Sequence, residues 1–366
     1  MAGSRTGLTA RSTPAVWFAS RVAVAVTAGA AIGSFGAAWL RGWYHWDVAL
    51  YIKVAQFGYG GFPRHYPDSG IAAFFPGLPL ALRAVHTVVS SWVASGLIVS
   101  LLASGVACVA LARLADMEGT RGPGAFAVLA LVVSPYAVFL AAGYSESLFL
   151  AFALPAWIAA RRRSWAAAGL LAAGASATRV TGLFLAAALF VEYAVVERRL
   201  RRDAVWLFAP LVTVGLFVWH LHHVLGDWLA WPHAESRVWG RHFTWPWLAL
   251  HHTLQYARAA GGHHDFVVQY YADLAAAGVG VALTVYLLWR RSYGEMTYVG
   301  LQVVALTTSS YYLSIGRATL LWWPLWILIG RAMMRRPAVA VGYVAVSAPL
   351  MVTMVVGFTA ANWWVG

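Results

Sequence analysis

Apolar stretches of about twenty residues recur along the chain, separated by shorter polar segments. A helix of this length crosses about 30 Å of hydrocarbon. The pattern therefore predicts an all-α fold, a polytopic transmembrane bundle of about ten to eleven spans that forms one domain over residues 1–366. The expected spans are 15–40, 92–114, 122–143, 147–160, 164–178, 182–197, 204–225, 269–290, 296–313, 318–332 and 338–360.

Two of the polar segments are long, residues 41–91 and 226–268. We expect 41–91 to be the first outer loop, with interfacial helices, and 226–268 to be the second large outer loop. Segment 74–90 is predicted to lie in or dip into the outer interface, because a further full span would break the alternation of sides. The Ala-rich stretch 166–178 indicates a closely packed helix.

Composition agrees with a chain whose solvent is the bilayer. Apolar residues make up 61% of the chain and charged residues 11%, against roughly 25% charged in soluble domains. The net charge is +13, but the arginines stand at the ends of apolar runs, which indicates topology and not a nucleic-acid surface. The positive-inside rule places Arg161–Arg163 and segment 198–202 in the cytoplasm and both long loops outside.

The first outer loop opens with a carboxylate, Asp47, at the start of a predicted amphipathic helix. The apolar row that predicts this helix on the outer surface is Trp46, Leu50, Val54 and Phe57. A helix dipole favours a carboxylate at its N-terminus. Asp47 is thus either a simple helix cap or a general base held at the membrane surface.

Three further charged residues stand at the outer ends of predicted spans. Glu146 is either a helix cap, or a ligand for sugar hydroxyls, or the partner of an arginine such as Arg179. Arg179 and Arg317 either extend to the interface or clamp a phosphate through their planar forks.

Histidine pairs at 222–223, 251–252 and 263–264 invite comparison with metal sites. Their spacing matches no standard zinc pattern. We predict no metal site, and expect these rings at the membrane interface. The single cysteine, Cys108, excludes an internal disulfide.

Several blocks in order between residues 40 and 330 resemble the PIG-V family of glycosylphosphatidylinositol mannosyltransferases and its bacterial relatives. The blocks are Trp46-Asp47 followed by Tyr51, Ala73–Pro76, Tyr144–Phe149, Gly226-Asp227 with Trp239 downstream, and Gly316-Arg317.

The resemblance implies a glycosyltransferase of the GT-C class in a bacterial cell membrane. Such an enzyme transfers a sugar, here most simply mannose, from a polyprenyl-phosphate-linked donor to a lipid or glycan acceptor. Transfer occurs on the outer side, with inversion and without a cofactor, and the partners are membrane lipids and not nucleic acid.

The resemblance also implies roles for single residues. Asp47 would be the general base. Glu146 and Asp227 would line the sugar site, and Arg179 and Arg317 would hold the leaving phosphate. The substrate-binding residues implied in all are His45, Trp46, Tyr51, Glu146, Arg179, Asp227 and Arg317.

The alternative is a transporter or lipid flippase. Such a protein needs a polar pathway through the midplane and often has two related halves. The sequence has few ionisable residues in the middle of its predicted spans, and no paired halves are detected.

Overall fold

The computed structural model describes residues 12–61, 70–117, 122–197, 199–259 and 264–362. Within these ranges the chain is helical and contains no β-strand beyond one isolated bridge between Phe243 and Ser309. The helices of the first half are α1 (Thr13–Ile32), α2 (Ala37–Arg41), α3 (Asp47–Phe57), η2 (Ile71–Ala73), α4 (Gly77–His86), α5 (Trp92–Met117), α6 (Pro123–Val132), η3 (Pro135–Leu140), α7 (Ser145–Arg161) and α8 (Trp165–Thr178).

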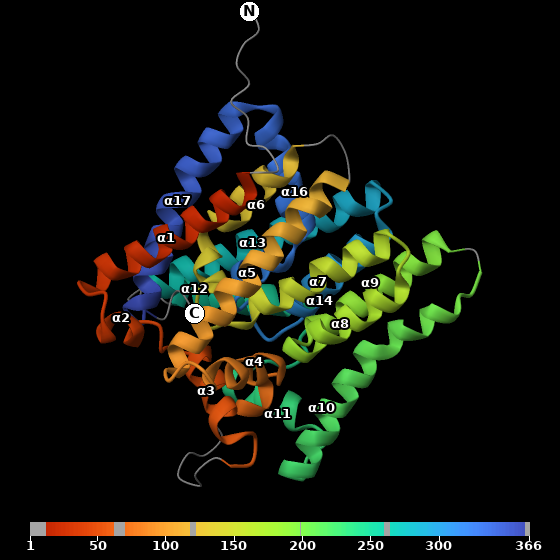
Figure 1. Ribbon diagram of the computed structural model, residues 1–366, viewed down its shortest axis with the longest axis horizontal. Coiled ribbons are helices and arrows are strands. Elements are labelled where there is room, and N and C mark those ends of the chain that lie inside the picture. Colours follow the sequence, from red (N-terminus) through yellow and green to blue (C-terminus); the bar gives the residue numbers. More distant parts are fainter. Residues whose placement is uncertain (1–11, 62–69, 118–121, 198, 260–263, 363–366) are drawn as a thin grey trace, which may run out of the picture.

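The second half continues in the same way (Figure 1). Its helices are α9 (Thr181–Val196), η4 (Arg202–Phe208), α10 (Ala209–Leu225), α11 (Ala230–Trp239), α12 (Pro246–Ala259), α13 (His264–Trp289), α14 (Tyr293–Thr307), α15 (Ile315–Ala318), η5 (Thr319–Leu321), α16 (Trp323–Arg335) and α17 (Pro337–Thr359).

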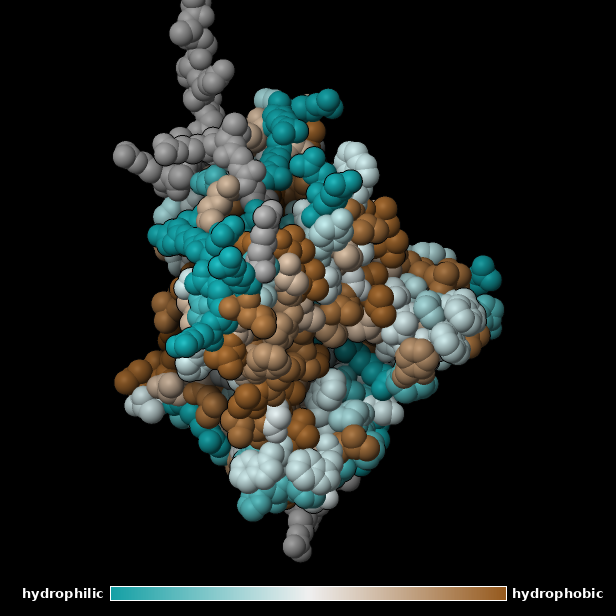
Figure 2. Space-filling view, turned by 90° about the vertical axis from the view of Figure 1, so that its right-hand side faces the viewer, coloured by the Kyte–Doolittle hydropathy of each residue, from teal (hydrophilic) through white to brown (hydrophobic). Residues whose placement is uncertain are grey.

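Five of these helical segments are long and apolar enough to cross a membrane. They are Thr13–Ile32, Trp92–Met117, Arg202–Leu225, Phe266–Trp289 and Pro337–Thr359. The buried share of these segments differs: only 17% of the most apolar window of α17 is buried, against 56% for that of α5, so α17 faces outward and α5 lies further inside the bundle. Figure 2 shows a broad apolar region between more hydrophilic ends. The all-α polytopic membrane fold is confirmed, whereas the full number of spans stays a prediction.

Two predicted spans are divided. The span expected over 15–40 ends at Ile32, because Gly33 takes a left-handed conformation (φ 70°) that terminates α1, and α2 follows separately. The span expected over 122–143 ends as an α-helix at Val132, and a 3₁₀ segment starting at Pro135 follows it. Proline has no N–H to donate to the preceding turn, which explains the break.

The centre of the bundle is built from α7 and α8, which contact each other extensively. Ala168, Ala172 and Ala175 of α8 are fully buried. A Cβ added at Gly169 would collide with the backbone of Trp206. Small side chains thus let the helix backbones approach closely, as the Ala-rich sequence predicts.

Three helices of the long outer segments, α3, α4 and α11, lie at the lower end of Figure 1, opposite α16 and α17. Segment 74–90 contains α4, whose ten residues are too few to span a bilayer. The helix predicted after His45 is α3, but it is packed among α4, α5 and η2. Its buried face is Val48, Tyr51, Ile52, Val54 and Ala55, and Phe57 of the predicted apolar row is 48% exposed.

Candidate active site

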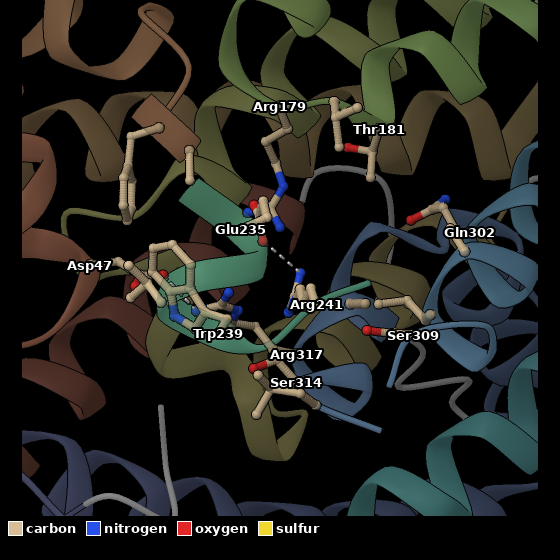
Figure 3. Close-up of a pocket in the computed structure, with 18 of the residues that line it drawn as sticks. Asp47, Arg179, Thr181, Glu235, Trp239, Arg241, Gln302, Ser309, Ser314 and Arg317 are labelled. Carbon is tan, nitrogen blue, oxygen red and sulfur yellow. Dashed lines mark hydrogen bonds and ion pairs between the residues drawn. The ribbon is translucent and has the colours of Figure 1, made fainter. Parts of the chain in front are cut away.

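A cavity of about 670 Å³ lies at this end of the molecule, between α3, η2 and α11 on one side and α9, α13, α14 and α15 on the other. Its volume is typical of sites that enclose small-molecule ligands. Its wall combines charged with aromatic side chains (Figure 3). The charged residues are Asp47, Arg179, Glu235, Arg241 and Arg317, and aromatic residues include Trp46, Tyr51, Phe74, Phe75, Trp231 and Trp239.

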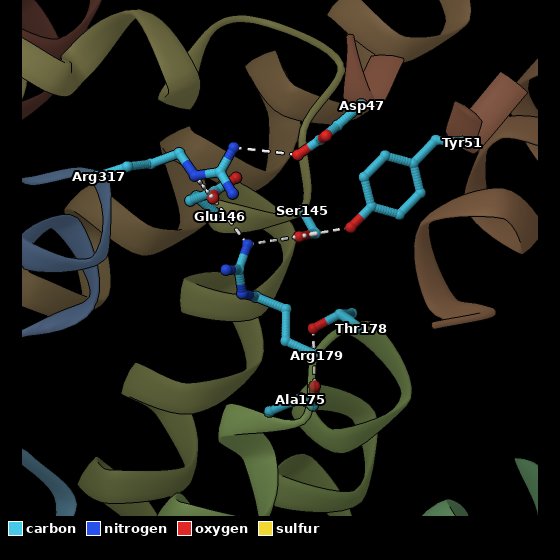
Figure 4. Close-up of polar contacts among 8 residues, drawn as sticks. All are labelled: Asp47, Tyr51, Ser145, Glu146, Ala175, Thr178, Arg179 and Arg317. Carbon is cyan, nitrogen blue, oxygen red and sulfur yellow. Dashed lines mark hydrogen bonds and ion pairs between the residues drawn. The ribbon is translucent and has the colours of Figure 1, made fainter. Parts of the chain in front are cut away.

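Two carboxylates and two guanidinium groups alternate at one side of this cavity (Figure 4). Nη1 of Arg317 donates to Oδ2 of Asp47 at 3.0 Å, and Nε of Arg317 lies 3.4 Å from Oε1 of Glu146. Nη1 of Arg179 donates to the same Glu146 oxygen at 2.7 Å. The four groups carry two negative and two positive charges, so the cluster is neutral overall.

Ser145 ties this cluster to α3. Its Oγ accepts hydrogen bonds from the Tyr51 hydroxyl at 2.9 Å and from Nη1 of Arg179 at 2.8 Å. Burial raises the pKa of Tyr51, so the phenol keeps its proton and remains a donor. The position of Arg179 is therefore set by both α7 and α3.

Glu146 is completely buried (0% exposed) in the first turn of α7. A buried carboxylate is tolerated when it is paired and hydrogen-bonded, and the N-terminus of α7 adds a favourable dipole. Its Oε2 has no partner among the described residues. The pairing with Arg179 that the sequence left open is present in the structure.

Arg317 is carried by the four-residue helix α15, which a buried carboxylate holds in place. Asp273 of α13 is 2% exposed. Its Oδ2 accepts from the Ser314 N–H at 3.0 Å and its Oδ1 from the Gly316 N–H at 2.8 Å. Asp273 thereby fixes the turn that precedes Arg317.

Aromatic rings hold Arg317 from another side. The guanidinium carbon lies 5.3 Å from the ring centroids of both Phe139 and Tyr144, within the range of cation–π contacts. Burial alone lowers the pKa of Arg317, but the carboxylates of Asp47 and Glu146 outweigh this effect and raise it. Arg317 is therefore a permanently charged and well-restrained cation.

Backbone strain marks both partners of the Asp47–Arg317 pair. Trp46, immediately before Asp47, has φ 45°, and Ser314, at the start of the Arg317 turn, has φ 59°. Non-glycine residues rarely adopt positive φ, and such strain concentrates at functional sites. The Trp46 ring packs edge-on against Phe358 at 5.1 Å, which holds it at the cavity wall.

A second ion pair also lines the cavity and was not predicted as part of the site. Oε2 of Glu235, on α11, is 3.7 Å from Nη1 of Arg241. Burial raises the pKa of Glu235, and Arg241 opposes this shift in part. The sequence did hold one signal: Trp231, Glu235 and Trp239 recur every four residues and so share a helix face.

The structure brings most of the predicted site residues together. Those that line the cavity are Trp46, Asp47, Tyr51, Arg179 and Arg317. Glu146 lies behind them and contacts both arginines.

Two predicted residues lie elsewhere. His45 is half-buried, and its ring faces Trp46 and Phe358 at centroid distances of 5.7 and 6.4 Å. Asp227 does not line the cavity, contrary to expectation: its Oδ1 accepts from the Leu229 N–H and its Oδ2 lies 2.7 Å from Nδ1 of His233. The Asp227 side chain thus stabilises its own turn by accepting a hydrogen bond from the backbone two residues later.

In the described part of the chain, no group of three or more histidine, cysteine or acidic side chains could hold a metal ion. Two of the histidine pairs have other contacts. His222 stacks on Trp228 at 3.9 Å, and Nδ1 of His252 lies 3.0 Å from the Ser310 carbonyl oxygen. His263 lies outside the described residues.

The family described as Mannosyltransferase (PIG-V) matches residues 15–202 of this sequence, slightly more than half of the chain. This chain belongs to the PIG-V mannosyltransferase family. Among curated relatives, "GPI alpha-1,6-mannosyltransferase 2" of Cricetulus griseus is 35% identical over 156 residues, and that of Mus musculus 36% over the same length. Each match covers 39% of this chain but only 30% of the relative. No solved structure gives a significant match.

The PIG-V match includes only part of the site. Asp47, Glu146 and Arg179 fall inside residues 15–202, whereas Glu235 and Arg317 fall after them. The fold thus joins residues of the matched PIG-V region to residues from the rest of the chain around one cavity.

Proposed function

We propose that this chain transfers mannose from a polyprenyl-phosphate-linked donor to a hydroxyl of a lipid or glycan acceptor, at the outer face of a bacterial membrane. Membership of the PIG-V family supports mannosyl transfer. The single observation that carries the proposal is the direct contact of Asp47 with Arg317 at the cavity wall. That contact supplies a proton acceptor and a phosphate ligand within one site.

Asp47 acts as the general base. Its carboxylate orients the acceptor hydroxyl and takes its proton as the acceptor oxygen bonds to the anomeric carbon. The bond between that carbon and the phosphate oxygen breaks in the same displacement, and the electron pair leaves with the polyprenyl phosphate. A single displacement inverts the anomeric centre.

Arg317 and Arg179 stabilise the leaving phosphate. Negative charge grows on the phosphate as the bond breaks, and preorganised cations beside it lower the barrier. Both guanidinium groups are held by carboxylates, so the donor phosphate competes with Asp47 and Glu146 for them. Donor binding would weaken the hold of Arg317 on Asp47 and leave that carboxylate available to the acceptor.

The surroundings of the cavity suit a lipid-borne donor. Exposed tryptophans are frequent in the segments that follow α10, as expected at a membrane–water interface; they are Trp228, Trp245 and Trp247. Apolar residues of α9, α13 and α14, among them Phe184 and Leu306, also line the cavity. These surfaces would allow the donor's apolar chain to remain in lipid while its phosphate reaches the arginines.

A direct test is transfer by the purified protein in nanodiscs from radiolabelled polyprenyl-phosphate-mannose to membrane lipid extract. Wild type should form a labelled product, and Asp47→Asn should lose it. A fitting control is Asp203→Asn, because Asp203 forms an ion pair with Arg201 away from the cavity.

Full transfer activity in Asp47→Asn would show that Asp47 is not the general base. If the wild-type protein moves labelled lipid across the vesicle membrane without forming product, the protein is a transporter and the proposal is wrong.

A further inference from the structure

The side of the cavity opposite Asp47 carries polar atoms that lack partners. Oγ1 of Thr181, Oε1 of Gln302 and Oγ of Ser309 are buried and have no hydrogen-bond partner in the described part of the chain. All three residues line the same cavity. In Figure 3, Gln302 and Ser309 lie on one side of Arg241 and Asp47 lies on the other.

Threonine hydroxyls on the neighbouring α13 and α14, and directly after α14, have partners in their own helices. Thr284, Thr297, Thr307 and Thr308 each donate to the carbonyl four residues earlier. Leaving a buried polar atom unpaired costs stability. A ligand that supplies the missing partners would offset that cost.

Gln302 is the most restricted of the three. Its side chain is 1% exposed, and its Nε2 donates to the Tyr298 carbonyl at 3.2 Å. That bond fixes the amide and leaves Oε1 as an acceptor, which Figure 3 shows turned towards the cavity. An acceptor carbonyl and two hydroxyls in the wall of one cavity match a ligand with several hydroxyl groups, since hydroxyls both donate and accept.

We infer that Thr181, Gln302 and Ser309 form a subsite for an uncharged sugar ring. None of the three is ionisable, whereas the Asp47 side of the cavity is strongly charged. The break between α8 and α9 joins the two regions, because it supplies Arg179 to the charged side and Thr181, two residues later, to the neutral one.

The ring that this subsite takes belongs to the acceptor, an assignment that rests on the proposed function. The donor's phosphate and the reacting hydroxyl must lie beside Asp47 and Arg317. The cavity is large enough to hold more than one sugar ring. The neutral subsite therefore binds the acceptor sugar next to the one that receives mannose, and it favours acceptors with at least two rings.

Binding of mannobiose, a neutral disaccharide, tests the subsite without any donor. Its Kd is measured by saturation-transfer NMR on the purified protein in nanodiscs. Gln302→Leu and Thr181→Val should each raise this Kd about 3- to 10-fold, the loss expected for one hydrogen bond. Thr297→Val is the matched control, because Thr297 bonds within α14 and does not line the cavity.

Thermal unfolding provides the second measurement. Thr181→Val replaces an unpartnered buried hydroxyl by a methyl group and should leave the Tm of the empty protein unchanged or higher. Gln302→Leu should lower the Tm slightly, because it also removes the hydrogen bond from Nε2 to the Tyr298 carbonyl. A lower Tm with an unchanged Kd would assign Gln302 a structural role and overturn the subsite.

The two proposals fail in different ways. Transfer by wild type, with a mannobiose Kd that neither variant alters, overturns the subsite alone. Mannobiose binding that depends on Gln302 and Thr181, in a protein that transfers nothing, retains the subsite and overturns the transferase.

Discussion

Asp47 and Arg317 are 270 positions apart in the chain, yet their side chains meet at 3.0 Å. One stands at the start of α3 and the other on the short helix α15. Trp46, directly before Asp47, and Ser314, at the start of the turn that carries Arg317, both have positive φ. The contact between this carboxylate and this cation is therefore made at the cost of backbone strain on both sides.

Replacing Arg317 by lysine should weaken donor use despite the conserved charge. The guanidinium reaches Asp47 through Nη1 and Glu146 through Nε, and a lysine ammonium lacks this planar fork. We expect kcat/KM for the donor to fall about 10- to 100-fold, the loss of one charged hydrogen bond. Steady-state kinetics with varied donor concentration would measure this fall. An unchanged kcat/KM would show that Arg317 does not bind the donor phosphate.

Glu146→Gln should act mainly on stability. It leaves Arg179 and Arg317 without their shared carboxylate in a buried setting. Breaking a buried ion pair costs about 3–5 kcal/mol, so the Tm should drop clearly. Asp203→Asn, at an exposed pair, is the comparison and should change the Tm little. Equal Tm values for the two variants would contradict the role assigned to Glu146.

Asp273→Asn should impair catalysis through Arg317 alone. The Ser314 and Gly316 N–H groups bond to different oxygens of Asp273, and an asparagine amide replaces one of these acceptors by an NH₂ donor. We expect a reduced kcat in the single variant and little further reduction when it is combined with Arg317→Lys, since the two changes affect one unit. Independent, multiplicative effects in this double-mutant cycle would show that Asp273 acts elsewhere.

Glu235 should make stability depend on pH. Burial raises its pKa in the folded protein above the ordinary 4.5. The folded state then binds its proton more tightly than the unfolded state, so this stabilisation is present below pH 4.5 and is lost as pH rises through the raised value. Tm measured from pH 4 upward should fall less in Glu235→Gln than in wild type. Parallel curves would show that Glu235 does not titrate differently on folding.

The sequence predicts the fold class well because helix length and the bilayer fix the pattern. It also places Asp47 and Glu146 at helix starts, since both stand where a polar segment meets an apolar run. The sequence could not show which of Asp227 and Glu235 lines the cavity. Both are carboxylates of one outer segment, and only the packing of α11 against η2 turns one of them into the cavity.

The Asp273 contact was equally hidden. Nothing in the sequence links an aspartate of α13 to backbone amides 41 and 43 residues later. Predicted helix ends failed at Gly33 and after Val132 because a single left-handed glycine or a following proline decides them, whereas hydropathy varies smoothly there. Tertiary contacts, not local propensity, therefore complete the site.

Asp47 and Glu146 neutralise Arg317 and Arg179 in the empty protein, and this pairing affects which lipids the site attracts. An uncompensated pair of guanidinium groups would attract the head groups of anionic phospholipids. Here each head group would first have to displace Asp47 or Glu146. If the arginines hold the donor phosphate as proposed, only a phosphate whose attached sugar gains further contacts in the cavity would offset the loss of these ion pairs, and the empty site would discriminate against bulk lipid.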